Sequence, residues 1–327
     1  MIRKLLKSAL ALTLMSATAS ALASPADNYP NRPIHWIVPF SPGGATDIVA
    51  RLVGKKLTEA WGQAVIVENK PGGGGIVGTN VVATAAPDGY TIGGVSLNFT
   101  IYPVLYNDVP FDIFNNLTPV TLVAKIPSVL VVYPKLPIYS VNDLIREAKA
   151  HPGAIGFASG GGVGTGGHVA GELFKKMTGV DMTHIPYKGG GPATIDLIGG
   201  HVQISFATTT SIITAIRAGE VRAIAVTSAK RFPLLPDLPT IAESGVPGFE
   251  TEEMQGIVAP AGVPKEILAK INTEIIKILQ MPDVKATLTN LGATPQAGTP
   301  EDFAKYLHSE VDKWRSVFKD SAVAAKK

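Results

Sequence analysis

The stretch that decides the fold is WIVPFSPGGATDIVAR, which runs from Trp36 to Arg51. Its apolar, β-rich beginning predicts a buried strand over residues 34–39. The strand ends in Pro-Phe-Ser-Pro-Gly-Gly. The apolar residues that follow recur every fourth position, as Ile48 and Leu52 do, which predicts a helix that stops before Trp61. A strand that passes through a glycine turn into a helix is the repeating unit of α/β proteins.

The same unit returns along the chain. Further apolar runs predict strands over residues 64–67, 90–95, 121–123, 129–133, 155–158, 182–185, 202–206, 223–227 and 256–259, and a helix over 77–86. The tail differs, because residues 264–279 and 301–319 carry apolar side chains at helical spacing, and Thr299 before Pro300 is a typical helix start. We expect a mostly parallel α/β fold, and 327 residues favour two lobes.

The first 23 residues have the pattern of a secretory signal peptide. Arg3, Lys4 and Lys7 precede a short apolar stretch, and the segment closes in Ala21-Leu22-Ala23. The apolar part is shorter than the roughly 20 residues that span a bilayer. We therefore expect cleavage near Ala23 and export of residues 24–327 from the cytoplasm.

The composition of the chain excludes several kinds of site and partner. The chain has no cysteine, which excludes disulfides, thiolate nucleophiles and thiolate metal sites, and leaves no lipid-carrying cysteine after the signal. The formal charge of +3 equals the three basic residues of the signal, because residues 1–23 contain no acid. The mature chain is thus close to neutral, which argues against nucleic acid as a partner.

Three glycine-rich turns each join a predicted strand to a predicted helix, at residues 39–47, 159–168 and 187–193. The first amides of a helix lack internal partners, and the helix dipole adds partial positive charge there. Glycine lets the backbone approach a ligand closely. Such turns predict sites for an anion such as a carboxylate or a phosphate.

The spacing Gly162-x-Gly164-x-x-Gly167 also fits a dinucleotide-binding turn, as does Gly73-x-Gly75-x-x-Gly78. Neither turn has an acid at the end of the next strand, and neither carries the Gly-Lys-Ser/Thr of a phosphate loop. An exported α/β enzyme that uses residues 162–167 for a nucleotide is therefore the alternative from another class. The chain has no Gly-x-Ser-x-Gly and no His-Glu-x-x-His, and its six histidines are scattered. We assign no catalytic residue, metal or cofactor.

Asp47 has two interpretations. Its position in the first helical turn, with Arg51 four residues on, suits a purely structural acid. Alternatively it faces an ammonium or hydroxyl group of a ligand and restricts which ligands are tolerated. His168 likewise either touches a ligand or is a polar residue at the end of a turn. Lys188 and Arg51 are the cations nearest to the turns, and we expect each to be solvated or paired.

The sequence resembles a known family at these turns and elsewhere. The segments that carry the resemblance are YPNRPIHWIVPFSPGGATDIVARLV, VENKPGGGGIVGTNVVATAAPDGYTI, HIPYKGGGPATIDLIGGHVQISF, LPDLPTIAESGVPGF and GIVAPAGVP. Together they are similar to the substrate-binding receptors of tripartite tricarboxylate transporters, also called Bug-type periplasmic proteins. The likeness covers essentially all of the mature chain, in order.

The resemblance implies a fold like that of type II periplasmic binding proteins, with two doubly wound sheets joined by a hinge. Lobe 1 would comprise residues 24–124 and 250–327, and lobe 2 residues 125–249, with crossings near 122–124 and 250–258. It implies a non-enzymatic, monomeric receptor that closes on a di- or tricarboxylate, an acidic amino acid or an aromatic acid. Delivery would be to a two-subunit membrane permease. A receptor that presents its ligand to a signalling protein stays a further alternative.

The resemblance also implies a set of ligand-binding residues, which the turns supply from both lobes. Asn98, after the third strand, is expected to face the same cleft. Relatives often carry an aromatic pair where this chain has Met254 and Gln255, so the ligand's size and aromaticity stay open. The set is Phe40, Ser41, Pro42, Gly43, Gly44, Ala45, Thr46, Asp47, Asn98, Ser159, Gly160, Gly164, Thr165, Gly166 and His168.

Overall fold

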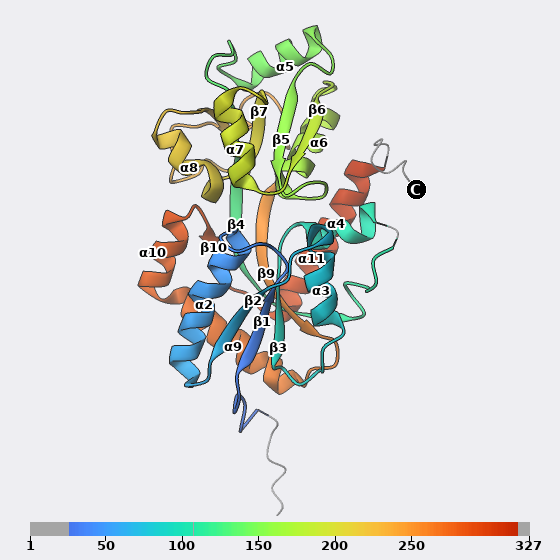
Figure 1. Ribbon diagram of the computed structural model, residues 1–327, viewed down its shortest axis with the longest axis vertical. Coiled ribbons are helices and arrows are strands. Elements are labelled where there is room, and N and C mark those ends of the chain that lie inside the picture. The colour runs from blue at the N-terminus through green and yellow to red at the C-terminus, as the bar shows by residue number, and fades with distance from the viewer. Residues whose placement is uncertain (1–25, 107, 320–327) are drawn as a thin grey trace, which may run out of the picture.

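The computed structural model describes residues 26–106 and 108–319, and the signal segment expected at residues 1–23 lies outside them. Two lobes stand one above the other, joined by long strands that run between them (Figure 1). Each lobe is a sheet with helices on both faces, which is the two-lobed α/β arrangement expected from the sequence.

Lobe 1 is the lower half of Figure 1 and has the sheet order β2-β1-β3-β9-β4, with β10 also on β4. The strands β1, β2 and β3 are parallel, whereas β9 and β4 are antiparallel to their neighbours. The bounds are β1 Ile34–Val38, β2 Val65–Asn69, β3 Thr91–Val95, β4 Leu117–Val132, β9 Glu252–Pro260 and β10 Thr294–Pro295.

Lobe 2, the upper half, is built on the far end of β4, with β8 on one side and β7-β5-β6 on the other. The strands β5, β6 and β7 are parallel, and β4 is antiparallel to β7 and β8. The bounds are β5 Gly156–Gly160, β6 Thr183–Tyr187, β7 Ile204–Thr208 and β8 Arg222–Val226.

Helices cover both faces of each sheet, because successive strand residues point to opposite sides. In lobe 1, Trp36 packs with α2 and α9, whereas its neighbour Ile37 packs with α4 and α11. In lobe 2, Leu130 faces α5 and α6, and Val131 faces α7 and α8. The helices are α2 Ala45–Trp61, α3 Ile76–Ala83, α4 Asn98–Leu105, α5 Val141–Ala150, α6 Gly166–Thr178, α7 Gly190–Gly199, α8 Thr209–Arg217, α9 Lys265–Gln280, α10 Pro282–Asn290 and α11 Pro300–Phe318, with a 3₁₀ turn, η1, at Gly73–Gly75.

The lobes are connected by β4 and β9. Strand β4 pairs with β9 as far as Pro127 and with β7 and β8 from Ser128 on. The sequence suggested two separate strands here, and that prediction was wrong: β4 continues through Lys125 and Pro127, which looked like an interruption. Pro127 is tolerated because it lies where the strand changes partners, and its carbonyl accepts a hydrogen bond from Thr209 Oγ1 at 2.6 Å.

Helix α11 also contacts both lobes. Its predicted start is confirmed, since Thr299 and Asp302 form a reciprocal capping box around Pro300. Its body packs on lobe 1, and its last turn reaches lobe 2, where Lys176 Nζ of α6 donates to the carbonyl of Ser316 at 2.5 Å.

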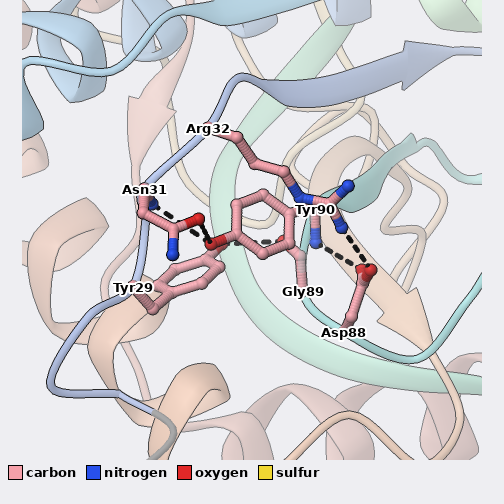
Figure 2. Close-up of polar contacts among 6 residues, drawn as sticks. All are labelled: Tyr29, Asn31, Arg32, Asp88, Gly89 and Tyr90. Atoms are coloured by element: carbon pink, nitrogen blue, oxygen red, sulfur yellow. Dashed lines mark hydrogen bonds and ion pairs between the residues drawn. The ribbon is translucent and has the colours of Figure 1, made fainter.

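The N-terminal segment is fixed to the loop before β3, as Figure 2 shows. Arg32 pairs with Asp88 at 2.7 Å and lies 4.1 Å from the ring centre of Tyr90. Tyr29 donates its hydroxyl hydrogen to the carbonyl of Gly89 at 2.7 Å. These contacts attach the start of β1 at the end of lobe 1 that lies away from lobe 2. Their role is therefore structural.

Candidate functional site

Loops from both lobes and part of β9 line a cavity of about 580 Å³. The loops β1–α2 and β2–α3 contribute from lobe 1, and β5–α6, β6–α7 and β7–α8 from lobe 2. Figure 1 places these loops at the facing ends of the lobes. Of the expected residues, ten line the cavity in the described part of the chain: Phe40, Ser41, Pro42, Gly43, Gly44, Ala45, Thr46, Gly160, Thr165 and Gly166.

The β1–α2 loop opens a 17-residue helix whose first amides have no side-chain cap. Gly44 stands at the N-cap in an extended conformation, and Gly43 has a φ of +83°, which favours glycine. The uncapped amides and the helix dipole therefore point a partial positive charge toward the cavity.

Asp47 braces this loop from behind and does not line the cavity. Its carboxylate accepts from the amide of Gly43 at 2.9 Å, from Arg51 Nε at 3.0 Å and from Asn69 Nδ2 at 2.9 Å. Asn69 Nδ2 also donates to the carbonyl of Phe40 at 2.9 Å. Burial alone would raise the pKa of Asp47, but the hydrogen bonds from Arg51, Gly43 and Asn69 outweigh it and hold the pKa below its usual value. The contacts of this acid in the structure are thus with its own loop.

The β5–α6 loop is held by Ser159, Gly164 and His168, which lie behind the cavity lining. Ser159 Oγ lies 2.7 Å from His184 Nε2, and the amide of Gly164 donates to His168 Nδ1 at 3.1 Å. Burial lowers the pKa of His168 to about 3, with His184 and Lys175 adding to the effect. His168 is therefore neutral and acts as an acceptor within the protein.

Asn98 begins α4 and also lies outside the cavity lining. Its side-chain amide donates to the carbonyl of Gly74 and to the hydroxyl of Tyr102, and it accepts from Ser96 Oγ at 2.6 Å. Because Gly74 and Ser96 do line the cavity, Asn98 positions lining residues.

Other lining residues were not among those the sequence assigned. The turn before α7 supplies Lys188 and Gly189, and the first turn of α7 supplies Gly190 and Gly191. Gly189 is the N-cap of α7, and the helix has no side-chain cap. The sequence predicts an anion site at this turn, but the residues of the turn are not in the expected ligand-binding set. An added Cβ on Gly160 would lie 2.6 Å from Gly190, so glycine lets these two turns approach closely.

Strand β9 contributes Glu253 and Gln255 to the cavity, while Met254 between them is buried in the lobe 1 core. Glu253 is the acidic residue and Lys188 the basic residue of the described lining. The starts of α2 and α7, which have no side-chain cap, lie at the same cavity, so backbone dipoles rather than a basic surface supply its attraction for anions.

The arrangement suits binding rather than catalysis. Ser159 and His184 are in contact like a nucleophile and its base, but Ser159 is fully buried and outside the cavity lining. Within residues 26–106 and 108–319, no group of three potential metal ligands occurs. A second hollow of about 480 Å³ contains Arg32, Asp88 and Tyr90, which are engaged with one another as Figure 2 shows.

Residues 49–323 match the family described as Tripartite tricarboxylate transporter family receptor. The chain belongs to this family. Protein BugT of Bordetella pertussis (strain Tohama I) is 38% identical over 314 residues, which is 95% of this chain and 96% of BugT. Family membership confirms the expected class, a solute-binding receptor and not an enzyme.

Solved structures agree with this assignment. The structure of R. palustris Rpa4515 with adipate has a TM-score of 0.84 and 37% identity, covering 91% of this receptor and 98% of that chain. The periplasmic binding protein BugD has a TM-score of 0.82 and 36% identity, covering 90% and 99%. The receptor therefore has the periplasmic-binding-protein fold. No helix of the described residues is both long and apolar enough to cross a membrane.

Proposed function

We propose that this receptor captures a small carboxylate in the cavity between its lobes and delivers it to a two-subunit membrane permease. The observation that carries the proposal is that the starts of α2 from lobe 1 and of α7 from lobe 2, neither with a side-chain cap, lie at one cavity. Amides at helix starts are suited to carboxylate oxygens. The adipate in the similar R. palustris structure supports the same ligand class.

The cleft is proposed to close by bending of the strands that join the lobes, with residues 24–124 and 250–327 moving against 125–249. The change of strand partners at Pro127 and Ser128 supports a bend close to this point. Closure would bring the α2 amides toward those of α7 and complete the shape that the permease recognises.

We place the receptor in the periplasm as a monomer, after cleavage near Ala23. Sequencing the N-terminus of the exported protein tests the cleavage site, and sedimentation of residues 24–327 tests the monomer. If uptake of the ligand persists in cells whose tripartite-type permease genes have been deleted, the transport assignment fails and a sensing role gains support.

A thermal-shift screen of residues 24–327 against organic acids tests the binding function. We expect at least one small di- or tricarboxylate, acidic amino acid or aromatic acid to raise the melting temperature, and nucleotides to have no effect. Stabilisation by nucleotides alone would favour the exported enzyme.

The variant Gly44→Asp tests the site itself. Gly44 has extended backbone angles, and an added Cβ meets nothing closer than 3.7 Å, so the N-cap accepts aspartate. Its carboxylate would occupy the α2 amides and repel the ligand, so we expect the acid-induced shift to disappear. Asn142→Asp makes the same charge change in the first turn of α5, on an exposed residue outside the cavity, and is expected to leave the shift intact.

A further inference from the structure

Glu253 occupies one of the anion positions of the cavity with a carboxylate of the protein's own. Its Oε1 accepts from the amide of Leu97 in lobe 1 at 2.8 Å. The backbone of Gly166, at the start of α6 in lobe 2, hydrogen-bonds to the same carboxyl group. The start of α6 therefore already has an acceptor, unlike the starts of α2 and α7.

Gln255 is the second unusual group. It follows Glu253 by two residues on β9, so the two side chains are on the same face of the strand, and both line the cavity. Gln255 is only 2% exposed, and its Oε1 has no hydrogen-bond partner. A buried amide oxygen without a hydrogen-bond donor destabilises the protein, so this position favours a ligand that brings a donor.

Resting on the proposed carboxylate-binding function, we propose that the ligand carries an ammonium or hydroxyl group that contacts Glu253 and Gln255. Its carboxylate then binds to the amides of α2 and α7, near Lys188. Glu253 stands in for a second ligand carboxylate, which makes an amino acid or a hydroxy acid a better ligand than a diacid of the same length.

The electrostatics of the cavity agree with this assignment. Burial raises the pKa of Glu253 to about 7, although hydrogen bonds from Leu97, Ser96 and Gly166 oppose the rise. A second carboxylate at this position would raise it further, whereas an ammonium group would stabilise the ionised form. A carboxylate ligand that lacks a donor would leave Gln255 Oε1 unpaired.

The test is a titration calorimetry series on residues 24–327 with matched acids of two lengths. The probes are succinate, 4-aminobutanoate and 4-hydroxybutanoate, and adipate, 6-aminohexanoate and 6-hydroxyhexanoate. We expect the amino or hydroxy member of at least one length to bind about tenfold or more tighter than its diacid, and the amino and hydroxy arms tell the two donors apart. A diacid that binds as tightly as its partners would overturn the inference and leave the proposed function standing. If no acid of the wider screen binds, the proposed function itself fails.

Variants on β9 make the test specific to these side chains. Glu253→Gln keeps the volume and removes the charge, so we expect it to abolish the preference for the amino acid over the diacid. Gln255→Leu removes the unpaired oxygen and is expected to reduce the preference for the hydroxy acid. Glu252→Gln is the matched control, because Glu252 is adjacent but does not line the cavity. An unchanged preference in folded Glu253→Gln and Gln255→Leu, verified by their melting curves, would contradict the inference.

Discussion

The β1–α2 loop of lobe 1 is braced by charged side chains, whereas the β5–α6 loop of lobe 2 is braced by neutral ones. Behind α2, Asp47 bonds to Gly43, Arg51 and Asn69. Behind α6, the neutral ring of His168 accepts from Gly164.

The difference follows from burial. Arg51 is 52% exposed at its side chain, so water solvates the positive half of the lobe 1 brace. His168 is only 1% exposed, and a charge there would lack solvation. Neither brace adds net charge beside the cavity, because the first is an ion pair and the second is uncharged. The attraction for the ligand is therefore left to the helix-start amides of α2 and α7.

The largest expected effect comes from filling a helix start in lobe 2 as Gly44→Asp does in lobe 1. An added Cβ on Gly191 meets nothing within 4 Å, and an acid in the first turn of α7 is favoured by the dipole. We expect Gly191→Asp to weaken carboxylate binding about 100-fold, or about 2.7 kcal/mol, measured by calorimetry. If only one of the variants Gly44→Asp and Gly191→Asp loses affinity for the carboxylate, a single lobe holds the anion.

The neutral brace predicts a loss of stability in acid. The pKa of His168 is about 3 in the folded chain, below the unfolded value of 6.5, so its stabilising effect is complete above pH 6.5 and decreases as the pH falls toward 3. When the pH falls from 6.5 to 5, one such histidine lowers the free energy of unfolding by about 2 kcal/mol. Urea unfolding of wild type and His168→Gln at both pH values should show a smaller loss in the variant by that amount. An equal loss in both would contradict a neutral His168.

The charged brace predicts a smaller effect on binding. Asp47→Asn removes charge-assisted hydrogen bonds to the loop and should cost about 1–2 kcal/mol in urea unfolding at pH 7. Because the folded pKa of Asp47 is lowered, this contribution is present above its ordinary pKa and is lost as pH falls through the folded value. Affinities for different acids should decrease together. A changed ranking of ligands would show that Asp47 contacts the ligand.

The smallest effect is expected at the exposed end of that brace. Arg51→Ala removes the half-exposed partner of Asp47 and should change the free energy of unfolding by less than about 1 kcal/mol. Ligand affinity should stay within about twofold, because Asn69 and Gly43 still hold Asp47. A large loss of affinity would place Arg51 in the cavity rather than behind it.

The sequence predicted the strand–turn–helix units well, because glycine turns and apolar periodicity are local. The loops that it singled out border the cavity, but the sequence did not predict which side of each loop a side chain occupies. Ser159, Gly164 and His168 belong to a loop that borders the cavity but are not part of its lining. Ser159 and His168 instead pack against His184 on another strand, which the local sequence does not reveal.

The local sequence pattern also did not predict that residues of β9 line the cavity. Which strand residues face the cavity depends on register against β4, and that register shifts between Leu122 and Ala124. The buried Met254 between two polar residues was the available signal, because alternation puts Glu253 and Gln255 on one face. The continuous β4 was missed because a proline usually ends a strand.

The central claim is that helix-start amides from both lobes hold one carboxylate ligand between them. A crystal structure of residues 24–327 grown with the acid that binds tightest in the screen tests it most directly. We predict a carboxylate within hydrogen-bonding distance of the first amides of α2 and of an amide at the start of α7. An acid bound elsewhere, or held only by charged side chains with those amides facing water, would contradict the account.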